Sequence, residues 1–177
     1  KNYSLLIVLF TLIGFAQPPA NYNLFYAGWD RVSTPANNAF GIHHPSGDIM
    51  KYARENNALT QVNSGGALCW QVADWDEGVT EPGSSGSGLW DLNHRLVGQL
   101  YGGQAACSGT NDNGQYDVYG RFDVSWDGTS AATRLRDWLD PSSTSTGTVD
   151  GWDPNQPTVA LDAGIQGINS PNGIICG

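Results

Sequence analysis

Charged side chains are scarce in this sequence, and basic ones are the scarcest. Only 14% of its 177 residues are charged, against about 25% in an average soluble domain. Eight Lys and Arg stand against 17 Asp and Glu, which gives a net charge of −9. Nucleic-acid binding needs a basic face that neutralises phosphates, and attachment to anionic lipid needs clustered basic residues. We therefore expect neither partner.

Apolar runs long enough to cross a bilayer are also lacking, so we expect no membrane span. The longest run, Leu5 to Ala16, has 12 residues, and as a helix it would rise about 18 Å, short of the ~30 Å hydrocarbon core. The positive charge of Lys1 precedes it, and Gly14 and Ala16 supply small residues before Gln17. This pattern is typical of a secretory signal peptide and predicts bacterial-type export to the extracellular space. A buried strand is the alternative interpretation.

Cysteine is limited to Cys69, Cys107 and Cys176. In an exported protein an odd number implies a partner outside the chain or a free thiol, and the sequence leaves the pairing open. The wide spacing gives no metal-ligand pattern, so we expect neither a metal nor another cofactor. Residues Asn111 to Asp117 are rich in oxygen ligands, but their spacing departs from the EF-hand pattern, and we interpret them as a polar loop.

Glycine and proline are plentiful, at 23 and 9 residues, which favours turns over long helices. Between Pro18 and Pro141, short runs of β-type residues alternate with turns, as in a sandwich or barrel. One helix is predicted near the end, with Asp127 or Thr129 as its N-cap and Leu135, Trp138 and Leu139 on one face. The fold class is therefore all-β with one C-terminal helix. The predicted strands are 22–29, 40–44, 49–53, 67–75, 89–91, 95–101 and 116–126, with a hairpin turn at 92–94.

The composition divides the chain into three parts. Residues 1–16 form the signal-peptide-like segment, and residues 17–141 form the β domain with its helix. Residues 142–149 are small and polar, like a flexible linker, and from Trp152 onward Pro, Gly and Asn alternate with short apolar pieces. We interpret residues 142–177 as a linker and the truncated start of a further β module.

The stretch from Gly78 to Gly88 is the most informative for function. It reads Gly-Val-Thr-Glu-Pro-Gly-Ser-Ser-Gly-Ser-Gly, so that serines lie between glycines. Glycines allow a sharp turn and a close approach of the backbone to a substrate. Such a turn can direct the N–H groups of Gly83 and Ser85 at one point, as a developing oxyanion requires. Ser85 would then be a nucleophile, although a flexible loop has the same composition.

Six motifs in one order place that stretch in a wider context. They are Asn23-Leu-Phe-Tyr-Ala-Gly-Trp-Asp-Arg31, Ile42-His-His-Pro45, Glu81-Pro-Gly-Ser-Ser-Gly-Ser87, Val97-Gly-Gln-Leu-Tyr-Gly-Gly103, Asp117-Val-Tyr-Gly-Arg121 and Leu135-Arg-Asp-Trp-Leu-Asp-Pro141. Over about residues 18–141 the chain resembles the C-terminal half of the lysyl endopeptidase family, a branch of the trypsin-like serine proteases. The resemblance implies an antiparallel six-stranded Greek-key barrel, the second barrel of a chymotrypsin-like fold.

The resemblance also implies roles for particular residues. Ser85 would be the acylated nucleophile, and the amides of Gly83 and Ser85 would form the oxyanion hole. Asp117 would lie at the base of the specificity pocket and pair with a basic side chain, Lys in this family, before the cleaved bond. Residues Leu100, Tyr101 and Gly102 would hydrogen-bond the substrate backbone as an added strand. Ser84 stands where most trypsin-like enzymes carry an Asp that pairs with the new N-terminus.

The catalytic base of this family is not found in the sequence. The Thr-Ala-x-His-Cys-like motif and the strand that carries the orienting Asp have no equivalent here, and we interpret His43 and His44 as structural and His94 as solvent-exposed. Cys107 matches a family cysteine that bridges to one near the mature N-terminus. We therefore expect a serine endopeptidase acting after Lys or another basic residue, with the first barrel supplied in cis or in trans. The alternative is a secreted non-catalytic binding module, either a pseudoprotease or a carbohydrate-binding β domain.

Overall fold

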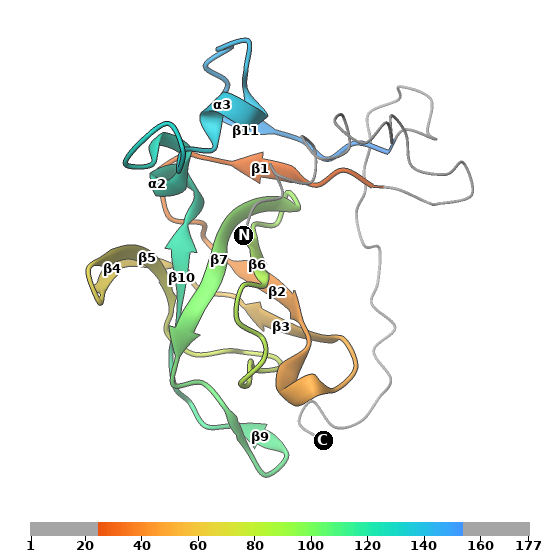
Figure 1. Cartoon of the computed structure of the whole chain (residues 1–177). Helices are drawn as coiled ribbons and strands as arrows, with labels where there is room; N and C mark the ends of the chain where they lie inside the picture. Colours follow the sequence, from red (N-terminus) through yellow and green to blue (C-terminus); the bar gives the residue numbers. More distant parts are fainter. Residues whose placement is uncertain (1–24, 154–177) are drawn as a thin grey trace.

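The computed structural model describes residues 25–153 (Figure 1). The signal-peptide-like segment 1–16 and most of the predicted C-terminal module therefore lie outside the described residues. Within residues 25–153, no helix has the length and apolar character needed to cross a membrane.

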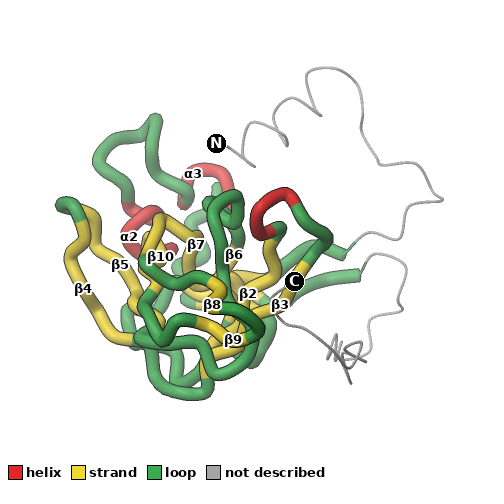
Figure 2. The backbone as a smooth tube through the Cα atoms, turned by 90° about the horizontal axis from the view of Figure 1, so that it is seen from below, coloured by secondary structure: helices red, strands yellow, loops and turns green. Residues whose placement is uncertain are grey.

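One large sheet dominates the described part of the chain. Its main path runs β3-β2-β6-β7-β10-β5-β4, and every neighbouring pair on this path is antiparallel. Figure 2 shows this order, from β4 and β5 on one side through β10 and β7 to β6, β2 and β3 on the other. The strands are β2 (Ala39–His43), β3 (Lys51–Glu55), β4 (Thr60–Ser64), β5 (Ala67–Val72), β6 (Gly88–Trp90), β7 (Arg95–Gly103) and β10 (Asp117–Arg121).

The all-β prediction is confirmed, whereas closure into a six-stranded Greek-key barrel stays a prediction. The main path has seven strands, and its outer strands β3 and β4 do not pair with each other in the described residues. The segment after β5 does return to the edge of β3, where Arg54 and Glu77 form an isolated antiparallel bridge. A separate hairpin, β8 (Cys107–Ser108) with β9 (Asn111–Asp112), projects beyond the sheet, and a short 3-10 helix, η1 (Pro45–Gly47), follows β2.

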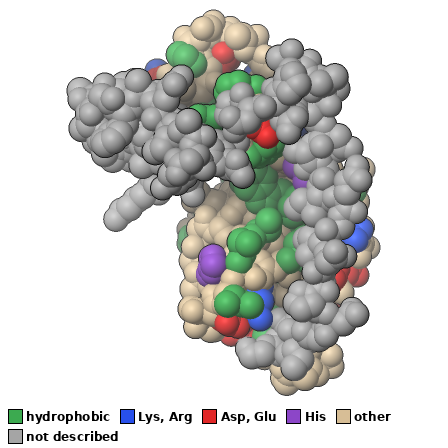
Figure 3. All heavy atoms as spheres, turned by 90° about the vertical axis from the view of Figure 1, so that its right-hand side faces the viewer, with side chains coloured by type: hydrophobic (Ala, Val, Ile, Leu, Met, Phe, Trp, Pro, Cys, Tyr) green, Lys and Arg blue, Asp and Glu red, His purple; other side chains and the backbone are tan. Residues whose placement is uncertain are grey.

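The sheet forms around aromatic and branched side chains. The main buried cluster comprises Ala39, Ala53, Leu59, Trp70, Val72, Trp75, Val79, Leu89, Val97, Leu100 and Tyr119. The sequence did not predict the polar strand β4, because this strand lies at the sheet edge, where Thr60 and Gln61 are exposed. Some apolar side chains stay at the surface, as expected of folded proteins. Figure 3 shows them on the side that carries β2, β3 and η1 in Figure 1.

The helical region differs from the single helix that the sequence predicts. The predicted strand 116–126 ends at Arg121, and α2 (Phe122–Asp127) follows it directly. Phe122 and Trp126 are buried against Trp29, while Val124 between them is 39% exposed. This pattern fits a helix, where residues i and i+4 share a face, and does not fit a strand.

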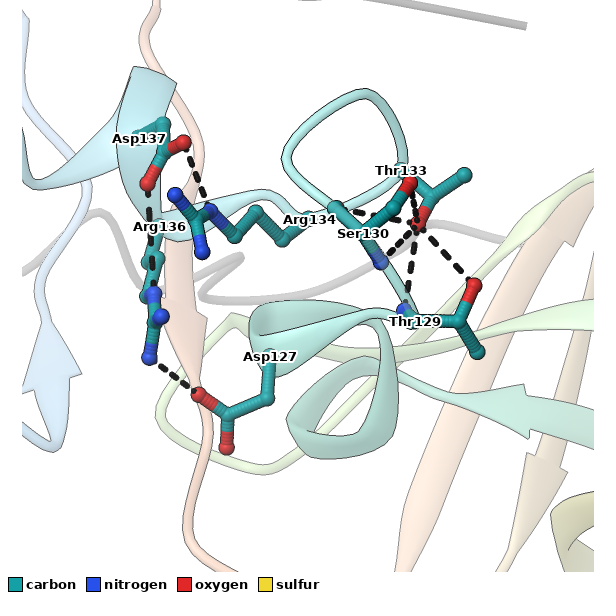
Figure 4. A network of polar contacts seen from close by, with 7 residues as sticks. All are labelled: Asp127, Thr129, Ser130, Thr133, Arg134, Arg136 and Asp137. Carbon is teal, nitrogen blue, oxygen red and sulfur yellow. Dashed lines mark hydrogen bonds and ion pairs between the residues drawn. The ribbon is translucent and has the colours of Figure 1, made fainter.

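The second helix, α3 (Arg136–Leu139), is much shorter than predicted. Residues before it do not continue α2, because the N–H groups of Thr129 and Ser130 donate to the Thr133 hydroxyl oxygen instead of to helix carbonyls (Figure 4). Leu135 and Leu139 both pack against the Trp29 cluster, but Trp138, which was predicted to share their face, is 47% exposed.

Two ion pairs hold α3 on the surface, and one of them connects it to α2. Arg136 contacts Asp127 at 2.9 Å, and Arg134 contacts Asp137 at 2.6 Å (Figure 4). Both pairs also line a cavity of about 600 Å³ beside Trp126. Because both pairs are exposed to solvent, which screens the charges, they contribute little to stability, about 0–1 kcal/mol each.

The chain after α3 returns to the sheet along β1 (Gly28–Asp30). β11 (Thr148–Val149) pairs antiparallel with β1, which in turn pairs parallel with β7. Arg31 donates to the carbonyl oxygens of Ser145 and Thr146, and Arg95 pairs with Asp150 at 2.5 Å. The boundaries proposed for the three parts of the chain stay a prediction.

Candidate active site

Two consecutive turns form the loop around Ser85. The Ser84 N–H donates to the Glu81 carbonyl oxygen at 3.0 Å, and the Ser87 N–H donates to that of Ser84 at 3.1 Å. The third residue of each turn is a glycine with positive φ, 101° at Gly83 and 85° at Gly86. This geometry is that of type II turns, which need glycine at this place. The glycines of the motif therefore serve the turns, as predicted.

The N–H groups of Gly83 and Ser85 and the Ser85 hydroxyl are uncommitted, meaning that they have no hydrogen-bond partner among the described residues. Gly83 and Ser85 are exposed, and neither N–H donates a hydrogen bond to another described residue. The Ser85 hydroxyl likewise has no hydrogen-bond partner among residues 25–153. Exposed donors without an internal acceptor are what an oxyanion site requires.

Hydrogen bonds on both sides hold the loop in place. On one side, the Ser46 N–H after β2 donates to the Pro82 carbonyl oxygen at 2.7 Å. On the other, the Gly86 N–H donates to the Leu100 carbonyl oxygen at 2.9 Å, and the Leu100 N–H donates to that of Ser87 at 2.8 Å. The loop is thus tied to β7 and to the end of β2.

Ser84 differs from its neighbours because its side chain points inward. It is 2% exposed, and its hydroxyl lies 2.9 Å from Nδ1 of His43, which is 3% exposed. Burial, together with a smaller effect of the nearby His44, lowers the pKa of His43 to about 4. His43 is therefore neutral near pH 7, in agreement with the structural role predicted for it.

Asp117 begins β10 and is almost fully buried, at 2% exposure. Its Oδ2 accepts hydrogen bonds from Trp75 Nε1 at 2.8 Å and from the Thr80 hydroxyl at 2.5 Å. Burial raises the pKa of Asp117, and these two hydrogen bonds oppose the rise because they stabilise the carboxylate. Its Oδ1 accepts no hydrogen bond from a described residue.

Gly103 of β7 lies directly opposite Asp117 in the sheet. A Cβ at Gly103 would stand only 2.1 Å from Asp117 Oδ1, so no other residue leaves room for this carboxylate. At Gly102, by contrast, a Cβ would meet nothing within 4 Å. The side of β7 that Gly102 faces is therefore open at this point.

These contacts bring the predicted site residues to one end of the sheet. β7 ends at Gly103 where β10 begins with Asp117, Thr80 contacts Asp117 five residues before Ser85, and Leu100 contacts the Ser85 loop. Leu100 is buried and its N–H and carbonyl both bond this loop, while Tyr101 is 56% exposed and Gly102 is half-buried.

The rings of the other two histidines have partners other than Ser85. His44 is exposed, with its ring near the Asp48 carbonyl oxygen, and His94 lies at the β6–β7 turn with its ring against Phe40. Neither has a hydrogen bond to Ser85 in the described part of the chain. His94 is half-buried, so the prediction that it is solvent-exposed is wrong.

Sequence reasoning missed three residues that shape the site. Trp75 and Thr80 hold Asp117, and nothing in their local pattern marks them as polar partners of a carboxylate. Glu81 is the third of these residues, and it is half-buried. It accepts hydrogen bonds from the Cys107 N–H at 2.6 Å and from the Ser46 hydroxyl at 3.3 Å. Glu81 thus joins three loops around the Ser85 turns.

The two described cysteines differ in their state. Cys69 is free and buried and Cys107 is disulfide-bonded, so the two are not paired with each other. Within the described residues, no three side chains of His, Cys, Asp or Glu gather in a way that could hold a metal ion.

Comparison with known proteins bears on the whole arrangement. The family model described as "Lysyl endopeptidase, C-terminal domain" matches residues 7–120, well over half of the chain. The lysyl endopeptidase of Pseudomonas aeruginosa is 43% identical over 97 residues, which cover 51% of this chain and 20% of that protein. The chain therefore spans about a fifth of the length of this relative. The match confirms the resemblance, and the chain belongs to the lysyl endopeptidase C-terminal domain family.

Proposed function

We propose that this chain carries the nucleophile, oxyanion site and specificity carboxylate of a serine endopeptidase that cleaves after Lys. The observation that supports this most is the joint placement of Ser85, the uncommitted amides of Gly83 and Ser85, and Asp117 at one end of the sheet. In a trypsin-like site these groups attack the carbonyl carbon, stabilise the oxyanion and bind the basic side chain.

In the proposed reaction, Ser85 Oγ bonds to the carbonyl carbon while its proton passes to a base. The carbonyl π electrons move to the oxygen, which accepts hydrogen bonds from the N–H groups of Gly83 and Ser85. When that electron pair returns, the C–N bond breaks and the leaving amine takes the proton from the base. Water then attacks the acyl-enzyme in the same way, which releases the acid and restores the Ser85 hydroxyl.

The environment of Asp117 favours Lys over Arg. A guanidinium binds a carboxylate best through two parallel hydrogen bonds, one to each oxygen. Here Oδ2 already accepts two hydrogen bonds, from Trp75 and Thr80, and only Oδ1 is uncommitted. An ammonium group can bind through that one oxygen, and Gly103 on the opposite strand has no side chain to cover it.

The base and its orienting carboxylate belong to a first barrel supplied in cis or in trans, outside the described residues. This part of the proposal rests on the lack of a hydrogen-bond partner for the Ser85 hydroxyl within residues 25–153. Export from the cell is part of the same proposal. It is supported by the segment before residue 17, which has the pattern of a signal peptide, although the family match begins within that segment, at residue 7.

Binding of a peptide that ends in Lys tests the specificity pocket without requiring catalysis. N-acetyl-Ala-Ala-Lys-amide should bind the 177-residue chain in an NMR titration, and the Arg peptide should bind more weakly. Asp117→Asn should weaken Lys binding at least tenfold, since a hydrogen bond to a charged group contributes about 1.5–3 kcal/mol. Asp74→Asn is the matched control because Asp74 is exposed on a nearby loop. Equal binding by wild type and Asp117→Asn would contradict the proposal.

A second experiment tests the need for a separate base. The chain alone should neither hydrolyse a Lys ester nor react rapidly with a serine-directed phosphonate at neutral pH. Turnover that Ser85→Ala abolishes would show that a base is present after all, and the two-barrel part of the proposal would be wrong.

A non-catalytic binding module is the second candidate. The specific observation in its favour is the uncommitted Ser85 hydroxyl, because a pseudoprotease needs no base. Exposed aromatic rings such as Trp152, which stacks on Tyr26 at 5.4 Å, offer a surface of the kind that stacks on sugars. Glycan-array binding that depends on Trp152 and does not depend on Asp117 would favour this candidate.

A further inference from the structure

Ser84 connects the exposed turns to the protein interior. Its neighbours Gly83 and Ser85 are exposed and present uncommitted N–H groups, whereas the Ser84 side chain is 2% exposed. Rotation of the backbone at Ser84 would change the direction of the Ser85 N–H relative to the Gly83 N–H, because Ser84 lies between the peptide groups that carry them. What holds Ser84 therefore decides how the two amides point relative to each other.

Every polar group of Ser84 has a partner. Its N–H donates to the Glu81 carbonyl oxygen, and its carbonyl oxygen accepts from the Ser87 N–H. Its hydroxyl oxygen accepts from the Glu81 N–H at 3.3 Å and lies 2.9 Å from His43 Nδ1. Glu81 and Ser87 belong to the same loop as Ser84, so His43 is the one partner that ties Ser84 to a strand of the sheet.

His43 is itself firmly placed. It ends β2, which pairs with β3 on one side and with β6 on the other. Its ring is 3% exposed, and its Nε2 has no hydrogen-bond partner in the described residues. The ring of His43 therefore makes one polar contact among the described residues, the one to Ser84. Without this contact, an apolar side chain would fill the buried position equally well.

We propose that His43 is a positioning residue, whose hydrogen bond to Ser84 sets the directions of the Gly83 and Ser85 N–H groups in the oxyanion site. It touches no substrate and acts through Ser84. The inference rests on the proposed function, because the oxyanion site has a purpose only in acyl transfer. The bond is neutral at pH 7, so the loop is held without an ion pair at this position.

Two peptides that differ at one group measure the oxyanion site separately from the pocket. N-acetyl-Ala-Ala-Lys with a free carboxylate presents a negative oxygen to Gly83 and Ser85, whereas its carboxamide does not. Both place Lys at Asp117. A net charge of −9 disfavours the anion. We expect the wild type to bind the carboxylate peptide several-fold more tightly than the carboxamide peptide. Such a difference would report hydrogen-bond donors close to the carboxylate.

The variants then decide the role of the hydrogen bond. Ser84→Ala and His43→Phe should bring the ratio of the two affinities close to one, while binding of the carboxamide changes by less than about twofold. His43→Asn should keep most of the ratio, because its side-chain amide can reach Ser84 from a position near that of Nδ1. His44→Asn, the same change at the exposed neighbour, should leave the ratio unchanged.

Each outcome is decisive. A ratio that survives Ser84→Ala in a folded protein would overturn the inference while leaving the proposed function intact. A wild type that binds neither peptide would overturn both. A general loss of packing would weaken both peptides equally and leave the ratio alone, which also contradicts the inference. If His43→Phe does not fold, Ser84→Ala decides, since it only removes one oxygen.

Discussion

Replacement of Gly103 by Ala should destabilise the protein far more than the same change one residue earlier. A Cβ at Gly103 would lie 2.1 Å from Asp117 Oδ1, 2.5 Å from the Tyr116 carbonyl oxygen and 2.7 Å from the Asp117 Cα. Ordinary contact needs about 3.5 Å, so β7 and β10 would have to separate locally by about 1 Å. Two of the three atoms belong to the backbone and cannot rotate away. We expect a loss of about 1–3 kcal/mol in the free energy of unfolding.

Gly102→Ala is the matched control, since a Cβ there meets nothing within 4 Å and its φ is not in the left-handed region. Urea denaturation followed by Trp fluorescence measures both variants. Gly102→Ala should change the free energy of unfolding by less than about 1 kcal/mol. In folded Gly103→Ala, binding of the Lys peptide should also weaken, because the Asp117 carboxylate is displaced. Equal stabilities of the two variants would refute the packing of Asp117 against β7.

Three further predictions concern pH and the aromatic cluster. The native state holds His43 neutral with a pKa of about 4, so the unfolded state binds more protons below pH 6.5. The free energy of unfolding should therefore fall from pH 7 to pH 5 by about 1–2 kcal/mol more in the wild type than in His43→Asn. An equal fall in both proteins, measured by urea denaturation at each pH, would contradict this. Burial raises the pKa of Asp117, so Lys-peptide binding should decline on acidification with a midpoint above 3.8, which an NMR titration against pH measures; a midpoint at or below 3.8 would contradict it. Trp126→Ala should lower the free energy of unfolding by about 3–5 kcal/mol in thermal or urea denaturation, since Trp126 is 5% exposed and its ring centroid lies 4.6 Å from that of Trp29. A loss below 1 kcal/mol would show that this cluster is not part of the core.

The sequence predicted most of the strands because their side chains reveal burial locally. The run around Trp70 and Val72 is aromatic and branched, and the turn at 92–94 has polar residues between two apolar runs. The helix was predicted less well. Phe122 and Trp126 lie four residues apart, a spacing that strands and helices share. Only the exposure of Val124 in the structure distinguishes the two.

The site was predicted in the same uneven way. Ser85 and its glycines were found because a turn with positive φ requires glycine in the sequence itself. Thr80 and Trp75 were missed because a partner for Asp117 can come from any strand, and the local sequence carries no record of distance in space. The role of His43 was left as generally structural for the same reason.

The sequence by itself determined that this is an all-β chain with a serine turn of the lysyl endopeptidase type. It could do so because alternating burial, glycine-dependent turns and ordered motifs are local properties of the chain. The tertiary structure alone decided that Asp117 has one committed and one open oxygen, that Gly103 makes room for it, and that His43 holds Ser84 from within. Those features depend on antiparallel register and on side chains separated by about 40 residues, as in the bond between His43 and Ser84. Such contacts form only when packing brings distant strands together.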